Sequence, residues 1–353
     1  AASGATVSAS DPAIDTNPAN GVGTQWVNST SGEMFVCTDA TTDENVWTNA
    51  GDGTGGVTPY VFQGSAYGYH YGGYTYPTTT NIIDKFSFTS DADATDVGNA
   101  TVARHALSGS HSGTYGFAAG GTSTSDVIDK VSLVSDGDAT DVGNLLAGKM
   151  CGAGCSSSTF GYMSGGEDGS AKQDVIQKYS FTSDGDATDV GNLTTVRSRS
   201  DNSSSSTHGY SAGGRNGNPV DIIEKFTFAS DSDATDVGNL LVATKEGCGG
   251  VNSTTHGYHC QGYTTYPTRQ NVIEKYSFAS DGNSTDVGDT VGTSVFSTGA
   301  SSTTHGYNMG GETAGSSPRN IIEKFTFASD ADSADIANLT RTSIGGARGG
   351  IQV

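Results

Sequence analysis

A single phrase, written six times with small changes, constrains this chain more than any other feature. Two apolar residues, an acidic residue and a lysine precede an aromatic-x-aromatic run, and then come Ser-Asp and Asp-Val-Gly or a close variant. Val131, Leu133 and Gln177 are departures from the pattern. The copies return every 45 to 50 residues and carry the lysines Lys85, Lys130, Lys178, Lys225, Lys275 and Lys324. A fixed period of this length indicates a solenoid, a propeller or an array, in which each unit needs neighbours to bury its apolar face.

The unit that begins at Gly209 shows what one copy contains. A short aromatic strand ends at Gly213 and Gly214, and residues 221–230, DIIEKFTFAS, follow with the period of two that a strand requires. The segment SDSDAT has turn chemistry, and DVGNLL predicts the next strand. Each copy therefore holds about four short strands and no helix, which is the content of a propeller blade. Six blades are expected, starting near residues 62, 116, 161, 209, 257 and 306.

The double glycine and the aromatic hairpin after it resemble the kelch motif over about five-sixths of the chain. The tryptophan that kelch blades often carry late in the repeat is absent, and Gln261 breaks the glycine pair in the fifth copy. The resemblance implies an all-β fold, a six-bladed kelch-like β-propeller over residues 57–353. Residues 341–353 align with the run before each Gly-aromatic pair, so we expect them to supply the first strand of the first blade and to close the ring.

The composition excludes several classes of protein. A formal net charge of -21 argues against nucleic acid as a partner, because binding to phosphates needs clustered Lys and Arg. No apolar run approaches the roughly 18 residues of a membrane span, so no membrane insertion is expected. Five cysteines do not make a disulfide framework, and the spacing leaves open whether Cys151 and Cys155 form a local bridge. The first residues show no signal peptide, so a signal was either removed or never present.

Comparing the copies with each other separates constant from variable segments. The SDxDATDVG turn is nearly uniform, whereas the stretch after the double glycine changes in length and chemistry. That stretch and the link between blades emerge on the same face of a four-stranded blade, and variable loops on a rigid scaffold usually carry recognition. The best contact candidates on this face are Tyr74, Tyr76, Arg215, Tyr263, Tyr266, Arg269 and Arg319. The alternative is that these tyrosines only cover the blade edge.

The acidic turns raise the question of calcium. Closely spaced carboxylates occur at Asp184, Asp186 and Asp189 and again at Asp231, Asp233 and Asp236. The EF-hand pattern is not met and no bidentate glutamate follows, so turn geometry is the favoured explanation and no cofactor is expected, with calcium as the alternative.

Histidines give little support to catalysis. His208, His256 and His305 occupy a repeated position that is Tyr67, Tyr115 and Phe160 in the other copies, so the position asks for a flat ring. No carboxylate pair stands out from the repeat background, and we expect the protein not to be an enzyme.

Residues 1–56 carry no repeat. A Pro- and Asn-rich loop is followed by three expected short strands, whose apolar residues Trp26, Phe35 and Trp47 are too few for an independent core. We therefore expect this segment to dock through them onto other proteins or to oligomerise. The phrases TQWVNSTSGEMFVC and NVWTNAG resemble the small meander modules of tail-fibre and other virion proteins of tailed bacteriophages, and the repeats resemble those of marine phage structural genes.

Together the resemblances imply a virion structural protein at the particle surface, assembled in the host cytoplasm and oligomeric on the particle. Its propeller is expected to bind a host-surface molecule, a glycan or a protein, as a tail-fibre or receptor-binding protein. Two alternatives stay open: a capsid decoration or head-fibre protein without a receptor role, and a secreted kelch-type lectin or enzyme.

Overall fold

The computed structural model describes residues 4–50, 61–244 and 246–353. It divides into two compact units, residues 1–61 and 62–353. Every regular element in the described residues is a β-strand, so the all-β prediction is confirmed. The boundary expected at residues 56 and 57 lies outside the described residues.

The smaller unit is a four-stranded sheet in the order β1-β2-β3-β4, formed by β1 (Thr6–Ser8), β2 (Gln25–Asn28), β3 (Met34–Asp39) and β4 (Val46–Asn49). The strand β1 lies in the segment that was expected to be a loop, and it pairs parallel with β2. Two parallel strands must be joined by a long connection, so a local sequence pattern cannot predict that they pair. Phe35, Cys37 and Trp47 form a buried cluster on this sheet, with Trp26 packed against it.

The larger unit contains the six copies of the repeat, here called copies 1 to 6. Copy 1 forms a three-stranded sheet, copies 2, 3 and 4 each form a four-stranded sheet, and copies 5 and 6 share one eight-stranded sheet through a parallel bridge between β22 and β26. Copy 1 contains β5 (Tyr67–Tyr71), β8 (Ile82–Ser87) and β9 (Thr95–Asn99). Copy 2 contains β10 (Ser108–His111), β11 (Tyr115–Ala119), β12 (Val127–Ser132) and β13 (Thr140–Asn144). Copy 3 contains β14 (Ala153–Ser156), β15 (Phe160–Ser164), β16 (Val175–Ser180) and β17 (Thr188–Asn192).

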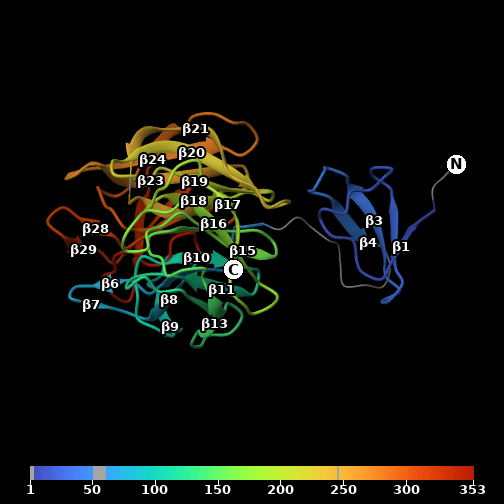
Figure 1. Ribbon diagram of the computed structural model, residues 1–353, viewed down its shortest axis with the longest axis horizontal. Helices are drawn as coiled ribbons and strands as arrows, with labels where there is room; N and C mark the ends of the chain where they lie inside the picture. The colour runs from blue at the N-terminus through green and yellow to red at the C-terminus, as the bar shows by residue number, and fades with distance from the viewer. Residues whose placement is uncertain (1–3, 51–60, 245) are drawn as a thin grey trace. The chain divides into compact units, whose positions relative to one another are not determined.

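Copy 4 contains β18 (Asp201–Ser204), β19 (His208–Ala212), β20 (Val220–Thr227) and β21 (Thr235–Thr244). Copy 5 contains β22 (Cys248–Asn252), β23 (His256–Thr265), β24 (Thr268–Ser277) and β25 (Thr285–Asp289). Copy 6 contains β26 (Thr298–Ser301), β27 (His305–Met309), β30 (Ile321–Thr326) and β31 (Ala334–Asn338). Within each copy the neighbouring strands are antiparallel, and the sheets follow one another in the larger unit (Figure 1). Together they are consistent with a β-propeller.

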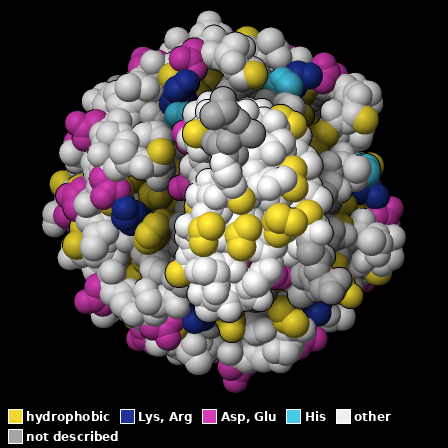
Figure 2. Space-filling model, turned by 90° about the vertical axis from the view of Figure 1, so that its right-hand side faces the viewer, with side chains coloured by type: hydrophobic (Ala, Val, Ile, Leu, Met, Phe, Trp, Pro, Cys, Tyr) yellow, Lys and Arg dark blue, Asp and Glu magenta, His cyan; other side chains and the backbone are white. Residues whose placement is uncertain are grey.

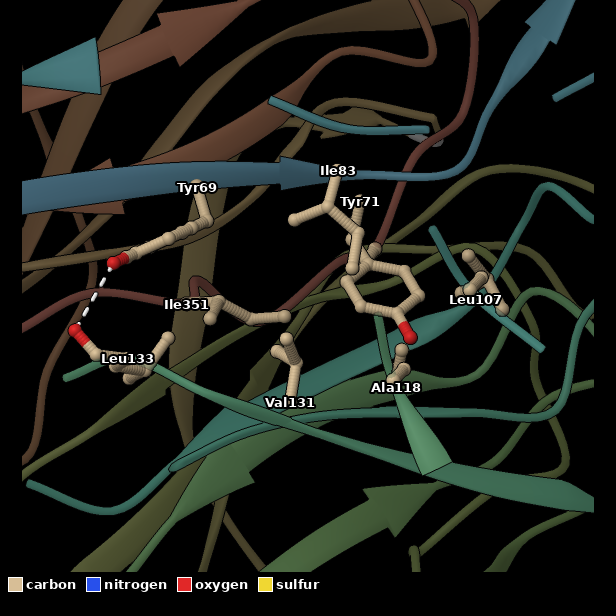
Figure 3. Packing of buried hydrophobic residues seen from close by; sticks show 11 residues of the cluster. Tyr69, Tyr71, Ile83, Leu107, Ala118, Val131, Leu133 and Ile351 are labelled. Carbon is tan, nitrogen blue, oxygen red and sulfur yellow. Dashed lines mark hydrogen bonds between the residues drawn. The ribbon is translucent and has the colours of Figure 1, made fainter. Parts of the chain in front are cut away.

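The repeated phrase explains how one copy packs on the next. The second aromatic residue of each phrase stacks on a ring in the preceding copy, as Phe228 does on Tyr162 at 4.9 Å between ring centroids. Four further pairs repeat this contact at 4.7 to 4.9 Å: Phe181 with Phe117, Phe278 with Tyr210, Phe327 with Tyr258, and Phe88 with Tyr307. The last pair joins copy 1 to copy 6. In copy 2 this aromatic residue is replaced by Leu133, which has no ring to stack. Copies 1 and 2 are instead joined here by a hydrogen bond from the Tyr69 hydroxyl to the Leu133 carbonyl oxygen, at 3.3 Å (Figure 3).

The C-terminal residues lie beside the first strand of the repeat region. The N–H groups of Tyr67 and Tyr69 donate to the carbonyl oxygens of Val353 and Ile351, each at 2.9 Å. The Ile351 side chain lies between residues of copies 1 and 2, among them Ile83 and Val131 (Figure 3). The chain can pass here because Gly349 has φ of 126° and no side chain: a β-carbon would lie 2.1 Å from the carbonyl oxygen of Gly109.

Two sets of charged contacts also link neighbouring copies. Each lysine of the phrase pairs with an aspartate in the turn of the next copy, at 2.5 to 2.9 Å, and Lys324 of copy 6 pairs with Asp91 of copy 1. In the space-filling view, basic and acidic side chains lie next to one another along the rim of the larger unit (Figure 2). The second set is buried: the acidic residue of the phrase meets an arginine from the preceding copy in the pairs Asp129 with Arg104, Glu224 with Arg197, and Asp84 with Arg341.

Candidate ligand-binding face

The loops that follow the double glycines and the segments that link one copy to the next come together on one side of the larger unit. Their backbones form isolated bridges, for example between Met150 and Glu167 and between Val295 and Glu312. We call the side formed by these loops and links the variable face, and the side formed by the Ser-Asp turns the uniform face. All eight arginines of the chain lie in these loops and links or in the C-terminal segment that continues the last of them.

A ring of backbone hydrogen bonds lies where the links enter the first strand of each copy. One residue per copy contributes, and each has φ between 57° and 65°: Ala106, Cys151, Arg199, Glu246, Phe296 and Gly345. The N–H of each donates to the carbonyl oxygen of its counterpart in the preceding copy, at distances from 2.6 to 3.2 Å. The ring closes on itself because the Ala106 N–H, before copy 2, donates to the carbonyl oxygen of Gly345, in the C-terminal segment that leads back to copy 1. Five of the six residues are not glycine, yet they adopt a left-handed backbone conformation that is unfavourable for residues with a side chain. The surrounding structure therefore imposes this conformation.

Charged and aromatic side chains gather around Arg199 of this ring. Its guanidinium donates to the Glu246 carboxylate and, at 3.4 Å, to Glu167. It also lies 5.7 Å from the centroid of the Phe296 ring. Burial raises the pKa of the nearby Cys151 thiol, and the Arg199 charge opposes that rise. The sequence does not predict this cluster, because its members lie in four different copies and belong to no common motif.

Three of the variable loops form raised hairpins. In copy 1, β6 (Tyr74–Thr75) pairs with β7 (Thr78–Thr79), and in copy 6, β28 (Glu312–Thr313) pairs with β29 (Ser317–Pro318). In copy 5, β23 and β24 continue past the double-glycine position as far as Thr265 and Thr268. The described loops of copies 2, 3 and 4 form no such strand pair. Figure 1 shows the three hairpins extending on the same side of the larger unit.

The four candidate tyrosines divide into two kinds. Tyr76 and Tyr266 lie at the hairpin tips and are 78% and 74% exposed. Tyr74 lies two residues before Tyr76 and contacts it edge-on, with the ring centroids 6.2 Å apart. Tyr263 lies three residues before Tyr266, and its ring is tilted against that of Tyr266 with the centroids 5.5 Å apart. Tyr263 is only 5% exposed, so little of its ring is available for a direct contact with a ligand.

The candidate arginines also differ from one another. Arg269 donates to the Tyr263 hydroxyl at 2.8 Å and to the Glu312 carboxylate at 2.9 Å, and so joins the hairpins of copies 5 and 6. Arg319 lies 3.3 Å from the buried Glu323 and donates to the Ser294 hydroxyl at 2.6 Å. Arg215 is half-buried, and its backbone bridges Ser198 in the link before copy 4. Two of these three arginines therefore brace loops instead of standing free for a ligand.

The residues expected to dock the N-terminal segment mostly face inward. Phe35 and Trp47 are buried in the core of the smaller unit, and Trp26 packs on Trp47 with its indole N–H donating to the Ser10 carbonyl at 2.9 Å. Phe35 and Trp47 therefore stabilise this unit and cannot meet a partner directly. The local sequence pattern did not predict β1, which adds a fourth strand to this sheet.

The carboxylates considered for calcium are all engaged by the protein. Asp184 and Asp231 pair with Lys130 and Lys178. Asp186 and Asp233 accept backbone N–H bonds from Asn144 and Asn192 at 2.9 Å, and Asp189 and Asp236 accept from Gly191 and Gly238 at 3.1 Å. In the described residues no group of three or more His, Cys, Asp or Glu side chains is arranged to hold a metal ion.

Cys151 and Cys155 do not form the bridge that the spacing left open, since both thiols are free and buried.

The repeated position that holds histidine in copies 4 to 6 holds Tyr or Phe in copies 1 to 3. Rings at this position cover the lysine of the phrase, with Lys85 4.3 Å from the centroid of Tyr67 and Lys130 4.6 Å from that of Tyr115. Elsewhere, His259 lies between Asp201 at 2.8 Å and the Thr244 hydroxyl at 2.5 Å. Burial lowers the pKa of His259, but Asp201 and Glu274 more than offset this and the net pKa is raised. All three side chains are fully buried, so no substrate can reach them.

Comparison with protein-family models and with curated proteins finds no match for this chain. Within the described residues there is no helix with the length and apolar character that crossing a membrane demands.

Proposed function

We propose that residues 62–353 form a closed six-bladed kelch-like β-propeller with one copy per blade. Four contacts between the C-terminal part of the chain and copies 1 and 2 support closure: Phe88 on Tyr307, Lys324 with Asp91, Arg341 with Asp84, and the Ala106 N–H on Gly345. The backbone pairing of residues 351–353 with β5 supports it as well. In an open array these contacts would be missing at the two ends.

We propose further that the protein is a structural component of a tailed-bacteriophage virion and that its variable face binds a host-surface glycan, as in a tail-fibre or receptor-binding protein. The observation that carries the binding role is the contrast between the two faces. On the uniform face every copy makes the same lysine–aspartate link, while on the variable face three copies carry hairpins, two of them with an exposed tyrosine at the tip. The virion assignment rests on the resemblance of the N-terminal phrases and of the repeats to phage structural proteins.

In this proposal the smaller unit contacts other virion proteins, and the protein is oligomeric at the particle surface after assembly in the host cytoplasm. The role is binding and not catalysis, and it requires no cofactor. The acidic turns fit this role, because their carboxylates already hold neighbouring copies together.

The test is cryo-electron microscopy of purified particles, with a search for density of the propeller at symmetric positions. Density at the tail agrees with the receptor-binding version, whereas density on the head favours a decoration protein. A free, monomeric protein secreted by cells would contradict the virion assignment and favour a lectin or an enzyme.

A further inference from the structure

We infer that the hairpins of copies 5, 6 and 1 form one continuous carbohydrate-binding surface, in which Tyr76 and Tyr266 each stack on a sugar ring. This inference rests on the proposed glycan-binding function and specifies the site and the way the ligand is held. We call the three hairpins, residues 74–80, 263–270 and 312–319, the hairpin surface.

The three hairpins are joined by direct contacts. Arg269 of copy 5 donates to both the carbonyl oxygen and the carboxylate of Glu312 in copy 6. The carbonyl oxygen of Arg319 accepts a bond from the Ser343 N–H at 2.9 Å, in the link that leads to copy 1. The Thr75 hydroxyl of copy 1 donates to the carbonyl oxygen of the adjacent Thr342 at 2.5 Å. A ligand that touches one hairpin therefore meets a surface whose other parts are already held in place.

The same device appears twice on this surface. In copy 1 the sequence YTYP places Tyr76 at the tip and Tyr74 behind it, and in copy 5 YTTYP places Tyr266 at the tip and Tyr263 behind it. Tyr74 is in turn 5.3 Å from the His105 ring, and Tyr263 is fixed by Arg269. The other copies complete their sheets without such a tip, so blade packing does not require it. An exposed ring that is held at its edge offers a rigid apolar face at little entropic cost to binding.

The surroundings favour a sugar over a protein as the ligand. The hairpin surface reads YTYPTTT, YTTYPTRQ and ETAGSSPR, with no Leu, Ile, Val, Met or Phe. A protein interface needs an apolar core around its aromatic anchors, which this surface lacks. Threonine and serine hydroxyls around an aromatic ring instead match a sugar, whose C–H face is apolar and whose rim carries hydroxyl groups. Two separate tips on one braced surface fit an oligosaccharide of several units.

The experiment uses the full chain and an immobilised array of bacterial surface polysaccharides and oligosaccharides. The variants are Tyr76→Ala, Tyr266→Ala and the double variant. Tyr115→Ala is the matched control, because Tyr115 is also partly exposed but begins β11 at the uniform-face end of that strand. Each tip variant is expected to lower the affinity for the bound glycan about tenfold, and the double variant further, with the control unchanged. Thermal melting checks that all variants fold.

Three results would count against the inference, each in a different way. If the native protein binds glycans and the double variant binds equally well, the site is elsewhere while the glycan-binding function stands. If binding to host cell envelopes is lost after protease treatment but survives periodate oxidation of the sugars, the ligand class is wrong. If the native protein binds neither the array nor host envelopes, the proposed receptor-binding function itself fails.

Discussion

The uniform and variable faces of the larger unit join neighbouring copies by different means. On the uniform face neighbouring copies are linked by a partly exposed ion pair between side chains, so every copy needs the same Lys and Asp residues. On the variable face the central joint is a bond between backbone groups, and Ala, Cys, Arg, Glu, Phe and Gly all serve. A face whose joints use the backbone leaves its side chains free to differ. This difference explains how one side of a regular scaffold can vary without loss of the ring.

Among the changes that test this difference between the two faces, removal of the C-terminal strand is expected to have the largest effect. Deleting residues 344–353 takes away Gly345 from the backbone ring and the partner of β5, and it opens the cluster around Ile351. We expect the truncated protein to unfold or to oligomerise through its unpaired strand edge. Circular dichroism melting and gel filtration measure both outcomes, and a melting curve like that of the full chain would rule out closure by this strand.

The buried joints on the variable face are expected to be costly to break. Arg197 and Glu224 are fully buried, so Arg197→Ala leaves a buried carboxylate without its partner and should lower the free energy of unfolding by about 3–5 kcal/mol. Denaturant titration gives the value.

A matched control comes from copy 3, where Gln177 occupies the place of Glu224 and accepts the Leu146 N–H at 3.0 Å. The double variant Arg197→Met, Glu224→Gln removes both charges and should recover most of the loss. If it is as unstable as Arg197→Ala, the cost lies in packing and not in the unpaired charge.

Acid should weaken the region where the chain closes. Burial lowers the pKa of His111 to about 4 and that of His70 to about 3, so both are neutral in the folded state. The unfolded state takes up these protons below its histidine pKa near 6.5, so stability is complete above that pH and falls as the pH is lowered toward 4. At pH 4.5 the difference between these two pKa values of His111 lowers the free energy of unfolding by roughly 2.5 kcal/mol relative to neutral pH. Unfolding midpoints of the native protein and of His111→Gln between pH 7.5 and 4.5 provide the comparison, and equal slopes for the two would contradict this assignment.

The uniform face should be the more tolerant of single changes. The Lys130–Asp184 pair is partly exposed, and its loss in Lys130→Met should cost less than about 1 kcal/mol. The small difference should shrink further in 1 M salt, because exposed charges are screened. A cost as large as that of Arg197→Ala would mean that the two faces do not differ as described.

Much of the fold could be predicted from the sequence because each copy repeats the same packing contacts. The phrase predicted the strand β20 and its equivalents. Comparing Tyr67, Tyr115 and Phe160 with the histidines predicted a flat ring at that position, but the contact of the ring with a lysine emerged only from the structure. The candidate site could be predicted from the sequence only in part. Tyr76 and Tyr266 are exposed as a contact requires, while Tyr263 and Arg319 are engaged within the protein.

The sequence alone determined the period, the strand content and the division into constant turns and changing loops, because these depend on local patterns that recur in each copy. Only the tertiary structure decided which loops meet, that copies 5, 6 and 1 form one braced surface, and that six unlike residues share a backbone ring. These backbone bonds join residues at least 45 positions apart and do not depend on which side chains those residues carry. Such contacts exist only once the copies are arranged in space.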